Sequence, residues 1–89
     1  MNDKTITAVS KILTKWNPLG SRAASISDLD GYQTEAIDIL FAIEVAPKSA
    51  SIATIVRDVL NQAFDLSLDL KVCTQPANEI GVLLKKYNH

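Results

Sequence analysis

The chain has 89 residues, of which 47% are hydrophobic and 21% charged, and its formal net charge is −1. This length predicts a single domain spanning residues 1–89, and the composition excludes an intrinsically disordered chain. No basic stripe marks a nucleic-acid binder, no apolar run reaches the roughly 18 residues of a membrane span, and three glycines and three prolines leave little turn chemistry for an all-β fold.

The first helix is predicted over Asp3–Trp16. Apolar residues recur at intervals of three and four, which is typical of one buried helical stripe. Asn17-Pro18 ends this helix, because the residue before a proline is pushed out of the α region. Residues 19–29 then form a connecting loop, with Gly20 free to adopt a left-handed turn.

A second helix is predicted to begin after Asp30, with Asp30 as N-cap and Gln33 as its capping-box partner. Ser27 or Asp28 are alternative caps. The helix is apolar over more than half of its circumference, which predicts a central helix contacted on several sides. Pro47 stops it.

A third helix is predicted over about residues 50–64, opened by Ser49 or Ser51. Residues 65–72 alternate apolar and polar side chains but have no partner strand, so we expect an extended connector or a short helical turn that lays leucines over the core. The fourth helix should start at Thr74-Gln75-Pro76, with the proline in its first turn. Gly81 either weakens this helix or lets a neighbour approach closely.

Negative charge is concentrated between Ala23 and Pro47. This segment carries −5 and contains no Lys or Arg, so the remainder of the chain carries +4. Acids close to a helix N-terminus stabilise its dipole, which accounts for Asp28, Asp30 and Glu35. It does not account for Asp38 and Glu44. The asymmetry therefore predicts either a solvated helix start or a face that meets a basic partner. The acids are Asp28, Asp30, Glu35, Asp38 and Glu44.

Catalysis and metal binding are not predicted. The only histidine is His89, which removes ordinary Ser-His and Cys-His pairs, and Cys73 reads as a buried thiol. An EF-hand register centred on Gly31 puts Ile26 and Ile37 where calcium needs carboxylates. We therefore predict no enzyme activity, no metal and no cofactor.

Two aromatic residues have open interpretations. Trp16, at the end of an apolar stripe, fits the core better than an exposed interface anchor. Tyr32 follows a glycine turn and lies off the helical stripe. It is predicted to be an interface residue, with a hydrogen bond back across the loop as the alternative.

The sequence Trp16-Asn17-Pro18-Leu19-Gly20, followed by Asp30-Gly31-Tyr32 and Glu35, resembles a family of small helical bacterial proteins of unknown biochemical activity. Their shared pattern is W-[DN]-P-[LI]-G, a short loop and an acidic D-x-Y-x-x-E helix start. Similar sequences occur as immunity proteins in toxin–immunity pairs, including those of contact-dependent growth inhibition. The resemblance spans about residues 6–64 and implies an all-helical fold and an immunity role, with no catalytic residues.

Together these observations predict an all-α, compact bundle of four main helices with two covering loops. The predicted function is neutralisation of a cognate toxin, a basic nuclease-like protein, in the cytoplasm. We expect no nucleic acid, membrane or small-molecule ligand. The alternative is a homo-oligomeric helical module with an unrelated regulatory role. The predicted partner-binding residues are Asp28, Asp30, Tyr32, Glu35 and Asp38.

Overall fold

Residues 3–26, 30–47 and 49–87 are described by a computed structural model, with the backbone alone for Ser25, Asp30 and Tyr87. The described residues form helices and loops and contain no β-strand, so the predicted all-α fold of four helices is confirmed. The elements are, in chain order, α1 (Asp3–Trp16), η1 (Gly20–Ser25), η2 (Asp30–Tyr32), α2 (Gln33–Val45), α3 (Ile52–Phe64) and α4 (Leu70–Tyr87), where η marks a short 3-10 helix.

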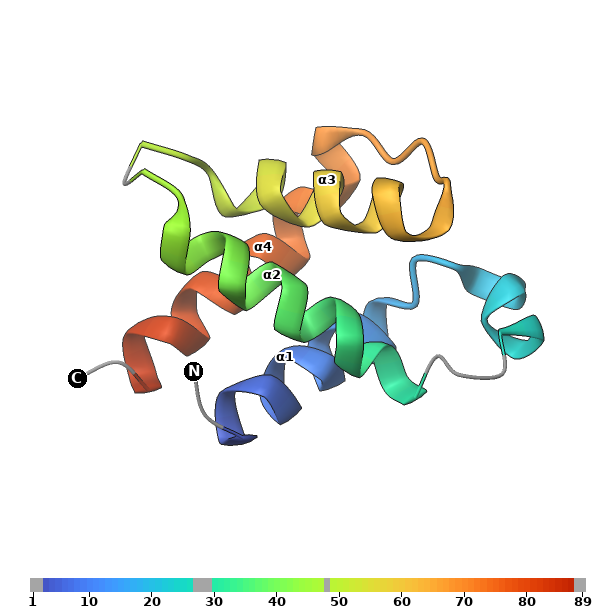
Figure 1. Cartoon of the computed structure of the whole chain (residues 1–89), viewed down its shortest axis with the longest axis horizontal. Helices are drawn as coiled ribbons and strands as arrows, with labels where there is room; N and C mark the ends of the chain where they lie inside the picture. Colours follow the sequence, from blue (N-terminus) through green and yellow to red (C-terminus); the bar gives the residue numbers. More distant parts are fainter. Residues whose placement is uncertain (1–2, 27–29, 48, 88–89) are drawn as a thin grey trace.

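Each α-helix packs against two others. Helix α1 contacts α2 and α4, and α3 contacts the same two helices, so the four surround one core (Figure 1). The radius of gyration is 12.2 Å, close to the roughly 12 Å expected of a compact domain of this length. Helix α2 runs across the face that Figure 1 turns toward the viewer.

The core takes residues from all four helices and from the segment between α1 and α2. On α1, Val9 and Leu13 stand one turn apart and are fully buried, as the apolar period predicted. The other members of the buried cluster are Leu19, Tyr32, Ala36, Ile39, Leu40, Val56, Leu60, Cys73 and Ile80.

Helix α1 has the predicted bounds, and Asn17 ends it. The Asn17 backbone N–H still donates to the Leu13 carbonyl at 2.7 Å, but its own φ is 51°. Asparagine tolerates this left-handed conformation better than most residues, and Pro18 cannot continue the helix. The predicted loop that follows is partly regular, because Gly20–Ser25 is η1; residues 27–29 lie outside the described part of the chain.

Helix α2 differs from the prediction at its start. It begins at Gln33, and Tyr32, with φ of 62°, occupies the N-cap position that was predicted for Asp30. Helix α2 is contacted by α1, α3 and η2, as the prediction of several contacts requires, but Phe41 is 59% and Val45 67% exposed. Among the described residues, the apolar surface of α2 therefore extends beyond the part that these elements cover.

Helix α3 and the connector after it largely match the prediction. Ser51 caps α3, accepting a hydrogen bond from the Thr54 backbone N–H at 3.0 Å, although the helix begins at Ile52 rather than at residue 50. Of the predicted connector, residues 66–69 lie outside any helix and Leu66 and Leu68 pack against the core, whereas residues 70–72 belong to α4. The Asn61 side chain braces residues 66–69 through two hydrogen bonds with the Leu68 backbone, of 2.8 and 3.2 Å.

Helix α4 starts earlier than predicted, at Leu70. The Asp69 carboxylate accepts a hydrogen bond from the Val72 backbone N–H at 3.0 Å, which is the geometry of an N-cap. Pro76 therefore stands inside the helix rather than in its first turn. In the part of the chain that the structure describes, no helix is long and apolar enough to cross a membrane.

Candidate functional site

The structure separates the five residues predicted to bind a partner. Asp28 lies outside the described residues, and Asp30 is described by its backbone alone, as the first residue of η2. Tyr32 and Glu35 are buried, and Asp38 is exposed. The three described side chains therefore do not form one surface.

Tyr32 is a core residue. Its side chain is 2% exposed, so the prediction that it stands on the surface is wrong. Its hydroxyl donates to Asn17 Oδ1 at 2.7 Å and accepts from the Leu19 backbone N–H at 3.3 Å. The alternative interpretation, a hydrogen bond back across the loop, is the one that the structure shows.

Tyr32 thereby closes the segment that joins α1 to α2. Its ring packs edge-on against Phe64 of α3, with the ring centroids 6.1 Å apart. One residue before it, the Gly31 carbonyl accepts from Thr14 Oγ1 of α1 at 3.1 Å. Burial raises the pKa of the Tyr32 hydroxyl, the hydrogen bond from Leu19 opposes that rise, and the charge of nearby Glu35 adds to it.

The resemblance motif consequently has a structural role in this chain. Asn17 supplies both the left-handed end of α1 and the acceptor for Tyr32, and Leu19 supplies a buried side chain and a backbone donor. Gly31, with φ of 65°, holds a left-handed conformation that costs other residues energy. We call this arrangement of Asn17, Leu19, Gly31 and Tyr32 the α1 clasp.

Glu35 is 8% exposed and lines a hollow of about 530 Å³ together with Arg22 and Phe64. The Arg22 guanidinium donates to the Phe64 carbonyl at 3.3 Å across this hollow. Glu35 is thus placed within the fold, and the exposed charge of α2 is carried by Asp38 and Glu44.

An exposed apolar stripe runs along the same side of α2 as these two acids. Ile37 and Phe41 stand one turn apart, Val45 follows one turn later, and their exposed fractions are 38%, 59% and 67%. Asp38 and Glu44 lie at helical neighbours of Phe41, three residues to either side. We call these five residues the α2 outer face. The sequence signal for it was a helix that is apolar over more than half of its circumference, which is more than its neighbours among the described residues cover.

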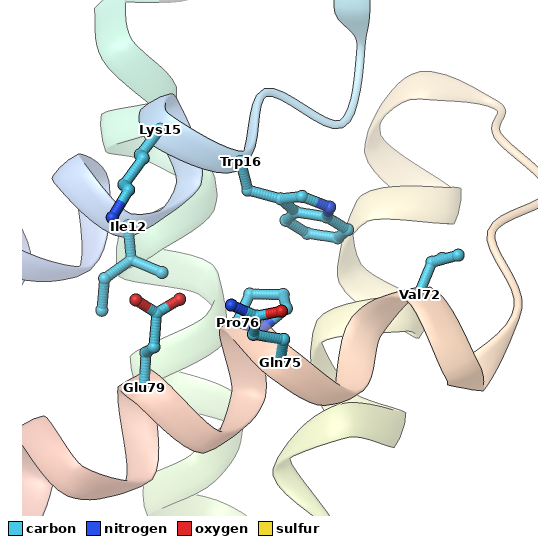
Figure 2. A pocket seen from close by; sticks show the side chains of 7 residues that line it. All are labelled: Ile12, Lys15, Trp16, Val72, Gln75, Pro76 and Glu79. Carbon is cyan, nitrogen blue, oxygen red and sulfur yellow. The ribbon is translucent and has the colours of Figure 1, made fainter.

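A second surface feature is a pocket of about 350 Å³ between α1 and α4, shown in Figure 2. One wall comes from the last turns of α1, where Trp16 presents its indole. Trp16 is partly buried against the core, as predicted, and also faces this pocket. The opposite wall comes from α4. The lining residues are Ile12, Lys15, Trp16, Val72, Gln75, Pro76 and Glu79.

Cys73, adjacent in sequence to this wall, is fully buried, so the prediction of a buried thiol is confirmed. Burial raises its pKa; the charge of Arg57 opposes that rise, and those of Asp69 and Asp58 reinforce it. A raised pKa leaves little reactive thiolate at neutral pH. Among the described residues there is no group of three or more potential metal ligands.

Comparison with known proteins places nearly the whole chain in one family. A family model described as a domain of unknown function, DUF1871, matches residues 8–88, which include the α1 clasp, the α2 outer face and the α1–α4 pocket. Searches among the curated proteins and among the solved structures found no significant match. The chain belongs to the DUF1871 family.

Proposed function

We propose that this chain binds a basic protein partner through the α2 outer face, and that the partner is a toxin which the chain neutralises by occupying it. The observation that carries the proposal is the exposed stripe of Ile37, Phe41 and Val45, flanked by Asp38 and Glu44 on a helix without Lys or Arg. An aromatic side chain at the centre of an exposed apolar patch is typical of an interface hot spot.

Charge favours a basic partner. The segment from Ala23 to Pro47 holds five acids and no basic residue. Enzymes that act on nucleic acids present basic surfaces to a polyanionic substrate, so a nuclease-type toxin would complement this face. Such complementarity speeds association and disfavours wrong partners, and it requires no chemistry from the inhibitor. The sequence resemblance to immunity proteins supports the same class of partner.

The same geometry disfavours the alternative, a homo-oligomeric module built on this face. Two copies of α2 crossing antiparallel about Phe41 would gather four acids, Asp38 and Glu44 of each copy, around one small contact. Like charges gathered in this way destabilise such a contact. A partner with Lys or Arg opposite these acids would remove this repulsion.

The test is protection from a cognate toxin. The protein encoded directly upstream of this chain is expressed in a bacterial host with and without the chain, and growth is followed. We expect the upstream protein to arrest growth and the wild-type chain to restore it. Phe41→Ser and Asp38→Lys should each abolish or strongly reduce protection.

Matched controls exist on the other helices. Val82→Ser removes an exposed apolar side chain from α4, and Asp58→Lys reverses an exposed aspartate in the middle of α3. Both should protect as well as the wild type. Loss of protection in the controls but not in the α2 variants would place the interface elsewhere, and an upstream protein that is harmless alone would remove the toxin from the proposal.

A further inference from the structure

The α1–α4 pocket has features that the proposed function does not use. Its α1 wall is formed by Ile12, Lys15 and Trp16, at helical spacings of three and four residues. Its α4 wall places Val72, Pro76 and Glu79 at corresponding spacings. Figure 2 shows the Trp16 indole on one side, over the turn of α4 that holds Pro76, and the charged ends of Lys15 and Glu79 on the other.

The two charges face the pocket from opposite walls. Lys15 comes from the last turn of α1 and Glu79 from the middle of α4, and no ion pair in the described part of the chain joins them. A ligand with a single charge would be attracted by one of these groups and repelled by the other. A ligand with both charges a few ångströms apart complements both.

The acceptor for an ammonium group on the α4 wall is the Glu79 carboxylate. An ammonium group has three donors, and the two carboxylate oxygens can accept from it. Val72 lines the same wall seven residues earlier, about 10 Å along the helix axis, so it bounds the other end of the pocket.

Apart from the Gln75 amide, the remaining lining is apolar. Ile12, the Trp16 ring and the Pro76 ring surround space for a small hydrocarbon side chain. The pocket volume of about 350 Å³ falls at the lower end of the range for small-molecule sites, roughly 300–1,000 Å³. It therefore suits a ligand of a few heavy atoms rather than a nucleotide.

We infer that this pocket binds a free α-amino acid with an apolar side chain, its carboxylate on Lys15, its ammonium on Glu79, and its side chain between Trp16 and Pro76. No sequence pattern indicated a small-molecule site, because the two walls lie some 60 residues apart along the chain. The inference concerns the α1–α4 pocket and does not depend on the α2 outer face.

The sole tryptophan of the chain reports directly on this pocket. Its fluorescence is titrated with L-leucine, with 4-methylpentanoate, which lacks the ammonium, and with isoamylamine, which lacks the carboxylate. We expect a saturable change in fluorescence with leucine at millimolar concentration. Each singly charged analogue should bind at least about tenfold more weakly than leucine, which is the loss expected for one charge-assisted hydrogen bond. Leucine should also raise the melting temperature, since it binds the folded state.

Variants locate the effect. Glu79→Gln and Lys15→Met should each weaken leucine binding by about tenfold, whereas Asp58→Asn and Lys11→Met, exposed residues outside the pocket, should not.

Two results would overturn the inference. One is the absence of a saturable change up to about 20 mM leucine, well above a millimolar dissociation constant. The other is equal affinity for leucine and for N-acetyl-leucine amide, an uncharged peptide mimic. That result would make the pocket a site for a side chain of a protein partner.

Discussion

Replacing Tyr32 with phenylalanine tests the role of the α1 clasp. The substitution removes one oxygen atom and keeps the ring that packs against Phe64. It leaves Asn17 Oδ1 without its 2.7 Å donor and the Leu19 backbone N–H without its 3.3 Å acceptor. Because Leu19 is itself buried, water cannot freely replace the lost partner of its N–H group.

The expected loss of unfolding free energy is about 1–2 kcal/mol. A typical hydrogen bond contributes about 0.5–1.5 kcal/mol, and the longer bond to Leu19 should lie at the low end of that range. For a domain of this size each 1 kcal/mol lowers the melting temperature by roughly 4–8 °C. Urea unfolding followed by circular dichroism measures the same free energy independently.

A double-mutant cycle isolates the contact itself. Asn17→Ala has a cost of its own, because alanine is disfavoured at φ of 51°. In the cycle with Tyr32→Phe that cost cancels and leaves the coupling between the two side chains. We expect a coupling near 1 kcal/mol. Additive effects of the two substitutions, or a Tyr32→Phe variant as stable as the wild type, would refute the clasp.

Three further outcomes follow from the fold. Gly81→Ala should stabilise the chain by about 0.5–1 kcal/mol in urea unfolding, because the added Cβ would meet Ile52 Cδ1 at an ordinary 3.6 Å; a loss of stability would show that this contact is too tight. Phe41→Ser should change the unfolding free energy by less than about 0.5 kcal/mol in the same assay, since this side chain is exposed, whereas a large loss would mean that it belongs to the core. Burial raises the pKa values of both Cys73 and Tyr32, so the folded state holds these protons more tightly than the unfolded state. The contribution of these two groups to the unfolding free energy should be complete at neutral pH and lost as the pH rises above about 9 for Cys73 and about 10 for Tyr32. Between pH 7 and 11, the urea midpoints of Cys73→Ala and Tyr32→Phe should therefore fall less than that of the wild type.

The helices were largely predictable because their signals are local. The three-and-four period of α1 and the cap at Ser51 depend on neighbours within one or two turns, and both were placed correctly to within two residues. The start of α4 differs, because the prediction placed Pro76 in the first turn of the helix, whereas the cap is Asp69, seven residues before it. Pro76 is tolerated inside the helix, where its ring is buried.

The candidate site was harder to predict, since it depends on which helix faces are covered. Tyr32 looked like a surface residue because it follows a glycine turn, but the hydroxyl finds its partners 13 and 15 residues away. Phe41 lies on a helix that is apolar over more than half of its circumference, and the packing of α2 against α1, α3 and η2 is what shows that this side chain is exposed. The pairing of α1 with α4 that forms the pocket leaves no trace in local sequence.

The most direct measurement of the central claim is a map of amide chemical-shift changes when the upstream-encoded protein is added to the isotopically labelled chain. Binding through the α2 outer face predicts the largest changes at Ile37, Asp38, Phe41, Glu44 and Val45. Because the face is acidic, these changes should shrink as salt rises at fixed protein concentration. Changes concentrated on α3 or α4 with α2 unaffected, or changes independent of salt, would contradict the account.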